Sequence, residues 1–350
     1  MKEVDISVIM SVFNEKEEWL RQSIESILNQ TFRNFEFIII NDNPQRNINS
    51  KILSEYKDRD KRIETIMNSE NIGLTKSLNV GLKLAKGDYV ARMDGDDISL
   101  PDRFKNQLKE FELDDRLVVL GTQGKYIFED QRTNLLMEKP VSNAGINWVL
   151  AAEGSPIIHS SAMFRRVDKN GKSIFYNEEF RKKQDFELWS RLVRQGFVKN
   201  LDFIGILYRI HKNQTVKSYD IKDYLLSSKV LAGNLEYIYR VSAFDAKKWA
   251  DSLNSTHYKK DNLKICVYLI LPFLSGKAKN QCENKDELDN LKKYVAFTYG
   301  KFTLRSIKAK MFNVAFKSWI YVFKHDLFYS FLFILQKIKS NISYHYSDKK

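Results

Sequence analysis

Short apolar runs alternate with amphipathic stretches over the first 100 residues, and this alternation strongly limits how the chain can fold. Residues 6–13 (ISVIMSVF) and 35–40 (FEFIII) are almost continuously apolar, as expected of strands buried on both faces of a parallel sheet. The stretch between them repeats apolar side chains at helical spacing, at Leu20, Ile24, Ile27 and Leu28. The order predicts an α/β fold with a mostly parallel, Rossmann-like sheet and right-handed crossovers.

The same alternation continues and then changes character along the chain. A helix at about 50–59, a strand near 62–67, a helix over 75–87 and a strand at 88–93 are predicted next. From about 101 to 218 the pattern is mixed, with helices in 101–112 and 182–196 and short strands in 160–166 and 205–210. Beyond about 219 almost every stretch is helical, with few glycines and one proline.

Charge divides the chain at about the same place. Residues 1–218 hold 34 Lys and Arg against 32 Asp and Glu, whereas residues 219–350 hold 23 against 12. Within 291–350 alone the count is 12 against 2. We therefore predict two domains, a near-neutral one over 1–218 and a basic, aromatic-rich helical region over 219–350.

Cysteines and apolar segments indicate where such a chain works. Cys266 and Cys282 form neither a metal-binding spacing nor a disulfide framework, which fits a reducing, cytoplasmic compartment. The first residues lack the basic start and the longer apolar stretch of a signal peptide, so they are interpreted as the first strand. The longest apolar runs, 265–274 and 327–335, are too short to span a bilayer as helices.

Polar residues gather where three of the predicted strands end, at 11–14, 41–43 and 94–97. In parallel sheets ligands bind beyond the carboxyl ends of the strands. Asp94, Asp96 and Asp97 lie within four positions, and carboxylates separated by a glycine suit a hard divalent cation such as Mg²⁺ or Mn²⁺. The alternative is a solvated acidic turn that caps the helix starting near Pro101. Glycine-rich dinucleotide and P-loop signatures are both absent.

Four stretches in order carry a family resemblance: ISVIMSVFNE, SIESILNQTFRNFEFIIINDN, NIGLTKSLNVGLKLAKGDYVARMDGDDISLPDRF and QDFELWSRL. Together they resemble family 2 glycosyltransferases, inverting enzymes with the GT-A fold, over about residues 5–215. The resemblance implies a sugar–nucleotide donor, usually UDP-linked, bound across the three strand ends. It also implies a metal held by an Asp-x-Asp pair.

The resemblance assigns roles to individual residues near the nucleotide. Phe13 stands where the family has an aromatic residue that stacks on or near uracil, and Asp42 matches the carboxylate that accepts the uracil N3–H. The neighbouring candidates that complete the nucleotide-sugar site are Ser11, Asn14, Glu15, Asn71, Gly73, Lys76, Asn79, Asp94 and Gly95. Ser11 replaces a common proline, and Leu78 replaces an arginine often found before the asparagine. Lys76 is the candidate to supply that positive charge, with an exposed helix lysine as the alternative.

The metal and the catalytic base come from the same resemblance. Asp94 and Asp96 match the Asp-x-Asp pair, with Asp97 close by and Asp102 expected in the first turn of the next helix. His211 is a further candidate ligand, with a structural histidine as the alternative. Asp185 matches the acidic residue that deprotonates the acceptor, although Gln184 replaces the glutamate usual before it. Its alternative role is an acid stabilised by a helix N-terminus.

These assignments predict transfer of a hexose or N-acetylhexosamine from a UDP-sugar to a glycan, in capsule, O-antigen or lipooligosaccharide synthesis. A sugar nucleotidyltransferase and a non-catalytic GT-A scaffold are the alternatives, and the first lacks its glycine-rich N-terminal loop here. The basic, aromatic tail predicts either docking on an anionic membrane, where a lipid-linked acceptor would lie, or a packed helical subdomain. We expect no nucleic-acid partner, because no recognition motif accompanies the charge. The roles of His159, which can face an acceptor, and of Trp189, expected in the core, stay open.

Overall fold

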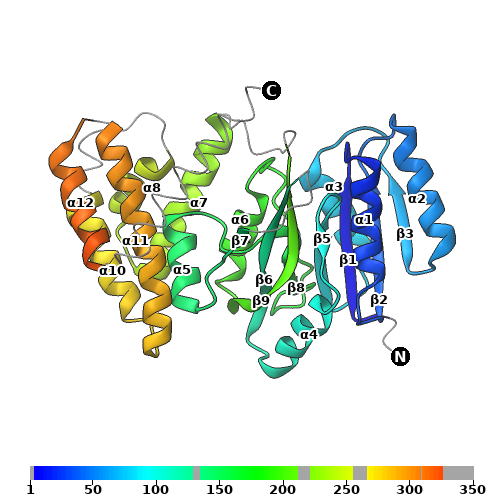
Figure 1. Ribbon diagram of the computed structural model, residues 1–350, viewed down its shortest axis with the longest axis horizontal. Coiled ribbons are helices and arrows are strands. Elements are labelled where there is room, and N and C mark those ends of the chain that lie inside the picture. Colours follow the sequence, from blue (N-terminus) through cyan, green and yellow to red (C-terminus); the bar gives the residue numbers. More distant parts are fainter. Residues whose placement is uncertain (1–3, 129–134, 212–220, 255–265, 309, 326–350) are drawn as a thin grey trace. The chain divides into compact units, whose positions relative to one another are not determined.

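The computed structural model describes residues 4–128, 135–211, 221–254, 266–308 and 310–325 (Figure 1). Its contacts divide the chain into two compact units. The first comprises residues up to Val141 together with Ser155–Asp223, and the second comprises Ser142–Gly154 together with the chain from Tyr224 onward. The predicted boundary at 218 stays a prediction, and the sequence did not indicate that 142–154 packs with the later helices.

Four parallel strands form one side of the nine-stranded sheet in the first unit. They lie in the order β3-β2-β1-β4 and confirm the predicted βαβ start of the chain. β1 and β2 are buried along their whole length, which explains their continuous apolar sequence. Their bounds are β1 Ile6–Val12, β2 Phe35–Asn41, β3 Ile63–Met67 and β4 Tyr89–Asp94.

Three helices connect these strands: α1 (Glu17–Leu28), α2 (Asn47–Arg59) and α3 (Leu74–Leu84). Each turns an apolar stripe toward the sheet and its charged residues outward. Gly81 of α3 lies so near the sheet that a Cβ there would approach Ile9 and Ile40 to within 2.8 Å. A glycine is therefore needed to seat α3 against β1 and β2.

The other side of the sheet is mixed in direction. β8 runs antiparallel to both β4 and β6, whereas the long strands β6 and β9 pair with each other in parallel. β5 and β7 are short antiparallel additions to β9 and β6. The bounds are β5 Ile98–Ser99, β6 Leu117–Phe128, β7 Leu135–Met137, β8 Met163–Arg165 and β9 Phe197–Ile210. The first unit also contains α4 (Arg103–Leu113), the 3₁₀ turn η1 (His159–Ser161) and α6 (Gln184–Leu192).

The second unit is helical, as predicted for the chain beyond 219. α5 belongs to it because Trp148 donates to the Thr298 hydroxyl, and because Trp249 donates to the Ala151 carbonyl. α11 packs on both α5 and α12. The elements are α5 Asn143–Ala152, α7 Ile221–Tyr239, which crosses the boundary, α8 Ala243–Asn254, the π-helical η3 Cys266–Ile270, α10 Leu271–Lys279, α11 Lys285–Lys308 and α12 Phe312–His325.

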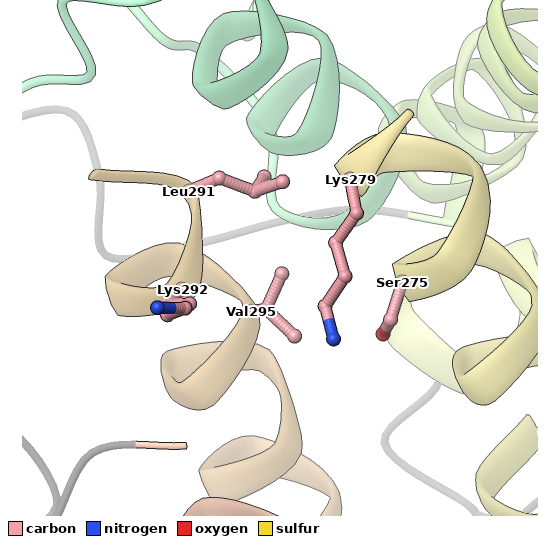
Figure 2. Close-up of a pocket in the computed structure, with 5 residues that line it drawn as sticks. All are labelled: Ser275, Lys279, Leu291, Lys292 and Val295. Carbon is pink, nitrogen blue, oxygen red and sulfur yellow. The ribbon is translucent and has the colours of Figure 1, made fainter. Parts of the chain in front are cut away.

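A small pocket lies between α10 and α11 in this unit, and Figure 2 shows Lys279 extending between the two helices. It is lined by Ser275, Lys279, Leu291, Lys292 and Val295, without a carboxylate. Among the described residues of the chain, no helix combines the length and the apolar character needed to cross a bilayer.

Candidate active site

The carboxyl ends of β1, β2 and β4 meet at one edge of the sheet. Val12 pairs with Asn41, and Ser11 pairs with Asp94, so the three polar segments predicted to form a site are neighbours in space. All three strands are parallel, and their following loops therefore leave the sheet on the same side. This is the place where an open α/β sheet binds its ligand.

The loop after β1 presents an aromatic ring at this edge. Phe13 is 39% exposed, while its backbone is fixed from both sides. Its N–H donates to Glu15 Oε2 at 2.8 Å, and its carbonyl accepts from Asn49 Nδ2 at 3.0 Å. Asn14 Oδ1 accepts from Asn43 Nδ2 at 2.8 Å. A fixed loop with an exposed ring offers a flat apolar face to a planar ligand.

Asp42 organises the loop before α3. Its Oδ1 accepts from Asn68 Nδ2 at 2.8 Å and from the Ile72 N–H at 2.9 Å, and its Oδ2 accepts from the Gly73 N–H at 2.9 Å. Gly73 has φ of +87°, a left-handed conformation that favours glycine. A carboxylate has about four acceptor positions, so Asp42 keeps capacity for a further donor.

The end of β4 carries two carboxylates with cationic or basic neighbours. Asp94 Oδ1 lies 2.5 Å from Nη1 of the buried Arg92. Asp96 Oδ2 lies 2.8 Å from His211 Nε2, and the His211 ring packs against Trp19. β9 ends directly before His211, so the parallel and mixed halves of the sheet both contribute to this cluster.

The other two carboxylates of the acidic segment have structural partners. Asp97 is buried, accepts from the Arg209 backbone N–H at 2.8 Å, and also accepts from the Ser160 hydroxyl. Asp102 lies directly before α4 and accepts from the Thr31 hydroxyl at 2.9 Å, without a side-chain capping bond of its own. The segment is therefore more than an acidic turn, since it links β4 to β9 and to Thr31 in the loop after α1.

Electrostatics at this edge disfavour so much negative charge. Burial is the main cause that raises the pKa of Glu15 to about 7, and the charges of Asp96 and Asp94 contribute to that shift. Burial is also the main reason why the pKa values of Asp94 and Asp97 are raised, and Asp96 again adds to the effect. Crowded carboxylates of this kind are stabilised by a cation bound among them.

Asp185 is the second residue of α6 and is partly buried. Its negative charge also adds to the raised pKa of Asp94. Burial raises the pKa of Tyr176, and the negative charges of both Asp185 and Asp94 add to this shift. The residue before α6, Lys183, has φ of +58°, which is unusual for a residue other than glycine. The candidate base therefore follows a strained helix start.

Comparisons with known proteins identify the family of the chain. The model of the family described as glycosyl transferase family 2 matches residues 7–172. An uncharacterized glycosyltransferase of Methanocaldococcus jannaschii is 30% identical over 257 residues, which cover 67% of this chain and 84% of that protein. The chain belongs to glycosyltransferase family 2. The O-antigen biosynthesis glycosyltransferase WbnJ of Escherichia coli is also similar, with 32% identity over 61% of this chain and 82% of its own.

Solved structures share the GT-A fold of this glycosyltransferase. S. aureus TarS in complex with UDP-GlcNAc has a TM-score of 0.54 and 15% identity, with 89% of each chain covered. The mannosyltransferase PcManGT from Pyrobaculum calidifontis, in complex with GDP-Man and Mn²⁺, has a TM-score of 0.50 and 13% identity, covering 91% of this chain and 86% of that one. The predicted fold class is confirmed.

The predicted metal ligands of the glycosyltransferase are neighbours with suitable chemistry. Across the described part of the chain, no three His, Cys, Asp or Glu side chains are grouped as ligands around one point. Asp94 is instead paired with Arg92, and Asp96 with His211. Asp94, Asp96 and His211 nevertheless supply carboxylate oxygen and imidazole nitrogen atoms, which are ligand types that Mn²⁺ binds.

The other predicted nucleotide-sugar residues occupy different settings. Asn71 is exposed, and its Oδ1 accepts from the Gly73 N–H at 3.0 Å. Lys76 is exposed on α3, whereas Ser11 is buried at the end of β1. Asn79 is buried and bonds to the backbone of Tyr176 through both side-chain atoms, so it holds the segment that leads to α6. A Cβ on Gly95 would lie 3.2 Å from the Glu15 side chain.

Sequence reasoning missed two arginines at the site. Arg92 is 1% exposed, and its charged end pairs with Asp94, two positions further along the same face of β4. Arg209 is fully buried and donates from Nε to the Asp96 carbonyl at 2.7 Å. An arginine inside an otherwise apolar strand, as in YVARMD, is the signal that points to Arg92, because such a charge requires a buried partner.

The two residues left open by the sequence are neighbours, with the ring centroids of His159 and Trp189 6.3 Å apart. His159 Nε2 lies 2.8 Å from the Tyr176 hydroxyl, and burial holds the pKa of His159 well below its usual value. Trp189 is fully buried and packs against Phe164, as expected for a core residue.

Proposed function

We propose that this glycosyltransferase is an inverting, metal-dependent enzyme that transfers a hexose or N-acetylhexosamine from a UDP-sugar to a hydroxyl of a glycan. One observation carries the proposal. In a member of this family, the acid cluster of Asp94 and Asp96 lies at the sheet edge. The negative charge of Asp185 adds to the raised pKa of Asp94, and the charges of Asp185 and Asp94 both act on Tyr176. A leaving-group site and a base near each other are what an inverting transfer requires.

The nucleotide half of the donor would lie at the ends of β1 and β2. The exposed ring of Phe13 would stack on the uracil, and Asp42 would accept its N3–H with the acceptor position still available. TarS, a structure with the same fold, was solved with UDP-GlcNAc and with UDP. We extend the UDP preference to this chain on that basis.

Asp94, Asp96 and His211 would hold the divalent cation, Mn²⁺ or Mg²⁺. When bound there, the cation supplies positive charge for the two phosphates of the donor. Asp97 and Arg209 would keep the ligand-bearing segment in place, because both join it to β9. The Mn²⁺ complex of PcManGT supports a metal in this fold.

Asp185 would act on the acceptor. Its carboxylate accepts the proton of the acceptor hydroxyl while that oxygen forms a bond to C1 of the donor sugar. The bond from C1 to the diphosphate oxygen breaks on the opposite face, and UDP leaves with the electron pair. Attack from the face opposite the leaving group inverts the configuration at C1.

The acceptor would be a glycan of capsule, O-antigen or lipooligosaccharide type, carried on a lipid at the inner face of the cell membrane. The O-antigen name of WbnJ supports the glycan class, and the basic, aromatic-rich second unit supports the location. The protein would be a peripheral partner of the membrane at this place.

A screen of UDP-sugars for release of UDP tests the proposal. We expect release that requires Mn²⁺ or Mg²⁺, stops with a chelator and rises when a glycan acceptor is added. Release of pyrophosphate from a sugar phosphate and UTP would instead identify a nucleotidyltransferase. Failure to bind UDP in calorimetry with Mn²⁺ present would identify a non-catalytic scaffold.

A further inference from the structure

Helix α12 carries two different faces. Its buried face consists of Met311, just before the helix, and of Val314, Ala315, Ser318 and Val322. Another face exposes Phe312, Phe316 and Trp319, at 67%, 61% and 42% respectively. These three positions follow helical spacing of four and three residues, so their side chains form one stripe along the helix. We call these three residues the aromatic stripe.

The stripe is continuous rather than scattered. The rings of Phe316 and Trp319 stack with their centroids 6.1 Å apart. Next to them along the helix, Lys317 places its amine 4.0 Å from the ring centroid of Tyr268 in η3, and Tyr268 is also exposed. Single exposed apolar side chains are ordinary, but grouped aromatic rings on a helix indicate a contact surface.

The chain near the stripe is basic, although two of its lysines are paired with carboxylates, Lys292 with Asp289 and Lys301 with Glu153. From residue 291 to residue 325, the chain contains eight Lys and Arg and no Asp or Glu, namely Lys292, Lys293, Lys301, Arg305, Lys308, Lys310, Lys317 and Lys324. Lys310 is exposed two residues before α12, and Lys277 is exposed on α10 beside the exposed Phe273. The partner of this surface must therefore be apolar in part and negatively charged.

We propose that the aromatic stripe and its lysines dock this glycosyltransferase on an anionic phospholipid membrane. Aromatic rings enter the boundary between headgroups and acyl chains, while lysines remain at the level of the phosphates. The inference rests on the proposed function in one respect, because a lipid-linked acceptor gives the enzyme a reason to be at the membrane. The docking itself needs neither the donor nor the cation.

Vesicle sedimentation of the full chain tests the surface. Vesicles of phosphatidylcholine alone are compared with vesicles of equal parts phosphatidylcholine and phosphatidylglycerol. We expect the protein to sediment with the anionic vesicles only. The combined change Phe312→Ser, Phe316→Ser and Trp319→Ser should weaken this binding roughly tenfold or more. A matched variant with Leu84→Ser and Leu113→Ser, two exposed leucines of the first unit, should bind as the wild type does.

A pair of charge variants tests the lysines in the same way. Lys277→Glu, Lys310→Glu and Lys317→Glu should reduce binding to anionic vesicles much more than Lys51→Glu, Lys57→Glu and Lys61→Glu, which lie in the first unit and change the net charge equally. Equal losses in the two variants would overturn the proposal, because they would mean that only total charge matters.

Other outcomes also decide the question. Unchanged vesicle binding by the stripe variant, or equal binding to neutral vesicles, would overturn the proposal. A large fall in melting temperature of the stripe variant would mean that another part of the chain covers these rings. Binding of RNA instead of vesicles would assign the surface to nucleic acid. UDP release with a soluble acceptor is measured separately, so an inactive enzyme that still docks through the stripe would contradict the proposed function alone.

Discussion

The two units of this glycosyltransferase differ in which kinds of side chain they bury and which they expose. In the first unit, three of the largest fully buried side chains are arginines: Arg92, Arg103 and Arg209. In the described part of the second unit the corresponding residues are aromatic, such as Trp148 and Trp249, and no charged side chain is buried. Conversely, seven of the nine exposed aromatic residues in the described chain belong to the second unit.

This difference corresponds to two different functions. A buried charge is costly unless it has partners, so it is retained where a ligand or a reaction needs a fixed charge. An exposed ring costs little in the isolated protein, but it becomes useful when another surface covers it. We infer that the first unit contains the chemistry and that the second unit makes the contact with the surroundings.

The largest effect is expected from Asp185→Asn. The amide cannot accept the acceptor proton, so turnover should fall by on the order of 10²–10⁴ while UDP-sugar binding is kept. Steady-state UDP release and calorimetry measure the two properties. Glu187→Gln is the matched control on α6, since Glu187 pairs with Arg191. Near-normal turnover of Asp185→Asn would remove Asp185 from the mechanism.

Arg92→Met should be the most destabilising of the single charge changes. Asp94 would lose its buried partner, and we expect the free energy of unfolding to fall by about 2 to 4 kcal/mol. Urea unfolding measures this value. Arg59→Met, which removes the exposed pair with Glu25 in the same unit, should leave the free energy nearly unchanged. Similar results for the two variants would mean that burial of Arg92 has no energetic consequence.

His159 should make the first unit sensitive to mild acid. Its pKa is lowered in the folded state by burial and by Arg92, so below the unfolded-state value of 6.5 the unfolded chain binds a proton that the folded chain does not. Stability is therefore present at higher pH and is lost as the pH falls, by at most about 1.4 kcal/mol per pH unit. His159→Gln keeps a polar partner for Tyr176.

The comparison of this variant with the wild type isolates the histidine from the carboxylates, which also titrate. Urea unfolding of both proteins between pH 7.5 and 5, at about half-unit steps, gives the two slopes. The wild type should lose more stability than His159→Gln over this interval. Parallel curves would contradict the assignment of a neutral, buried His159.

The smallest effect concerns the start of α6. Lys183 has a left-handed backbone, and Lys183→Gly should raise the free energy of unfolding by at most about 1 kcal/mol through relief of strain. Gly73→Ala, directly before α3, is the opposite case. The added Cβ would meet no atom within 4 Å, but the φ of +87° at this position disfavours alanine. That change should lower stability by about 1 to 2 kcal/mol. Chemical denaturation of both variants checks the signs.

The sequence predicted local structure well and distant pairing poorly. The buried strands β1, β2 and β4 and the helices between them follow from continuous apolar runs and helical spacing, which are local signals. β6 pairs with β9, about 80 residues further along, and nothing in either strand specifies that partner. α5 joins the second unit through the hydrogen bonds of Trp148 and Trp249, which likewise depend on distant residues.

The candidate site shows the same contrast between residues found from local motifs and residues placed by distant contacts. Asp42, Asp94, Asp96 and Asp185 were found because motifs carry them, and the structure places them at or near one sheet edge. Arg209 and Tyr176 were missed, since their positions depend on how β9 and the segment before α6 pack. Asn79 was assigned to the nucleotide-sugar site from its motif, and its hydrogen bonds are to Tyr176 and Glu178. A motif identifies a position, whereas its partners depend on the fold.

Calorimetric titration of UDP with and without Mn²⁺ tests the central claim most directly. The wild type should bind UDP only when Mn²⁺ is present, Asp96→Asn should lose this binding, and Asp185→Asn should keep it. Equal binding of UDP with and without the metal, or unchanged binding by Asp96→Asn, would contradict the claim that the acid cluster after β4 holds a cation for the diphosphate.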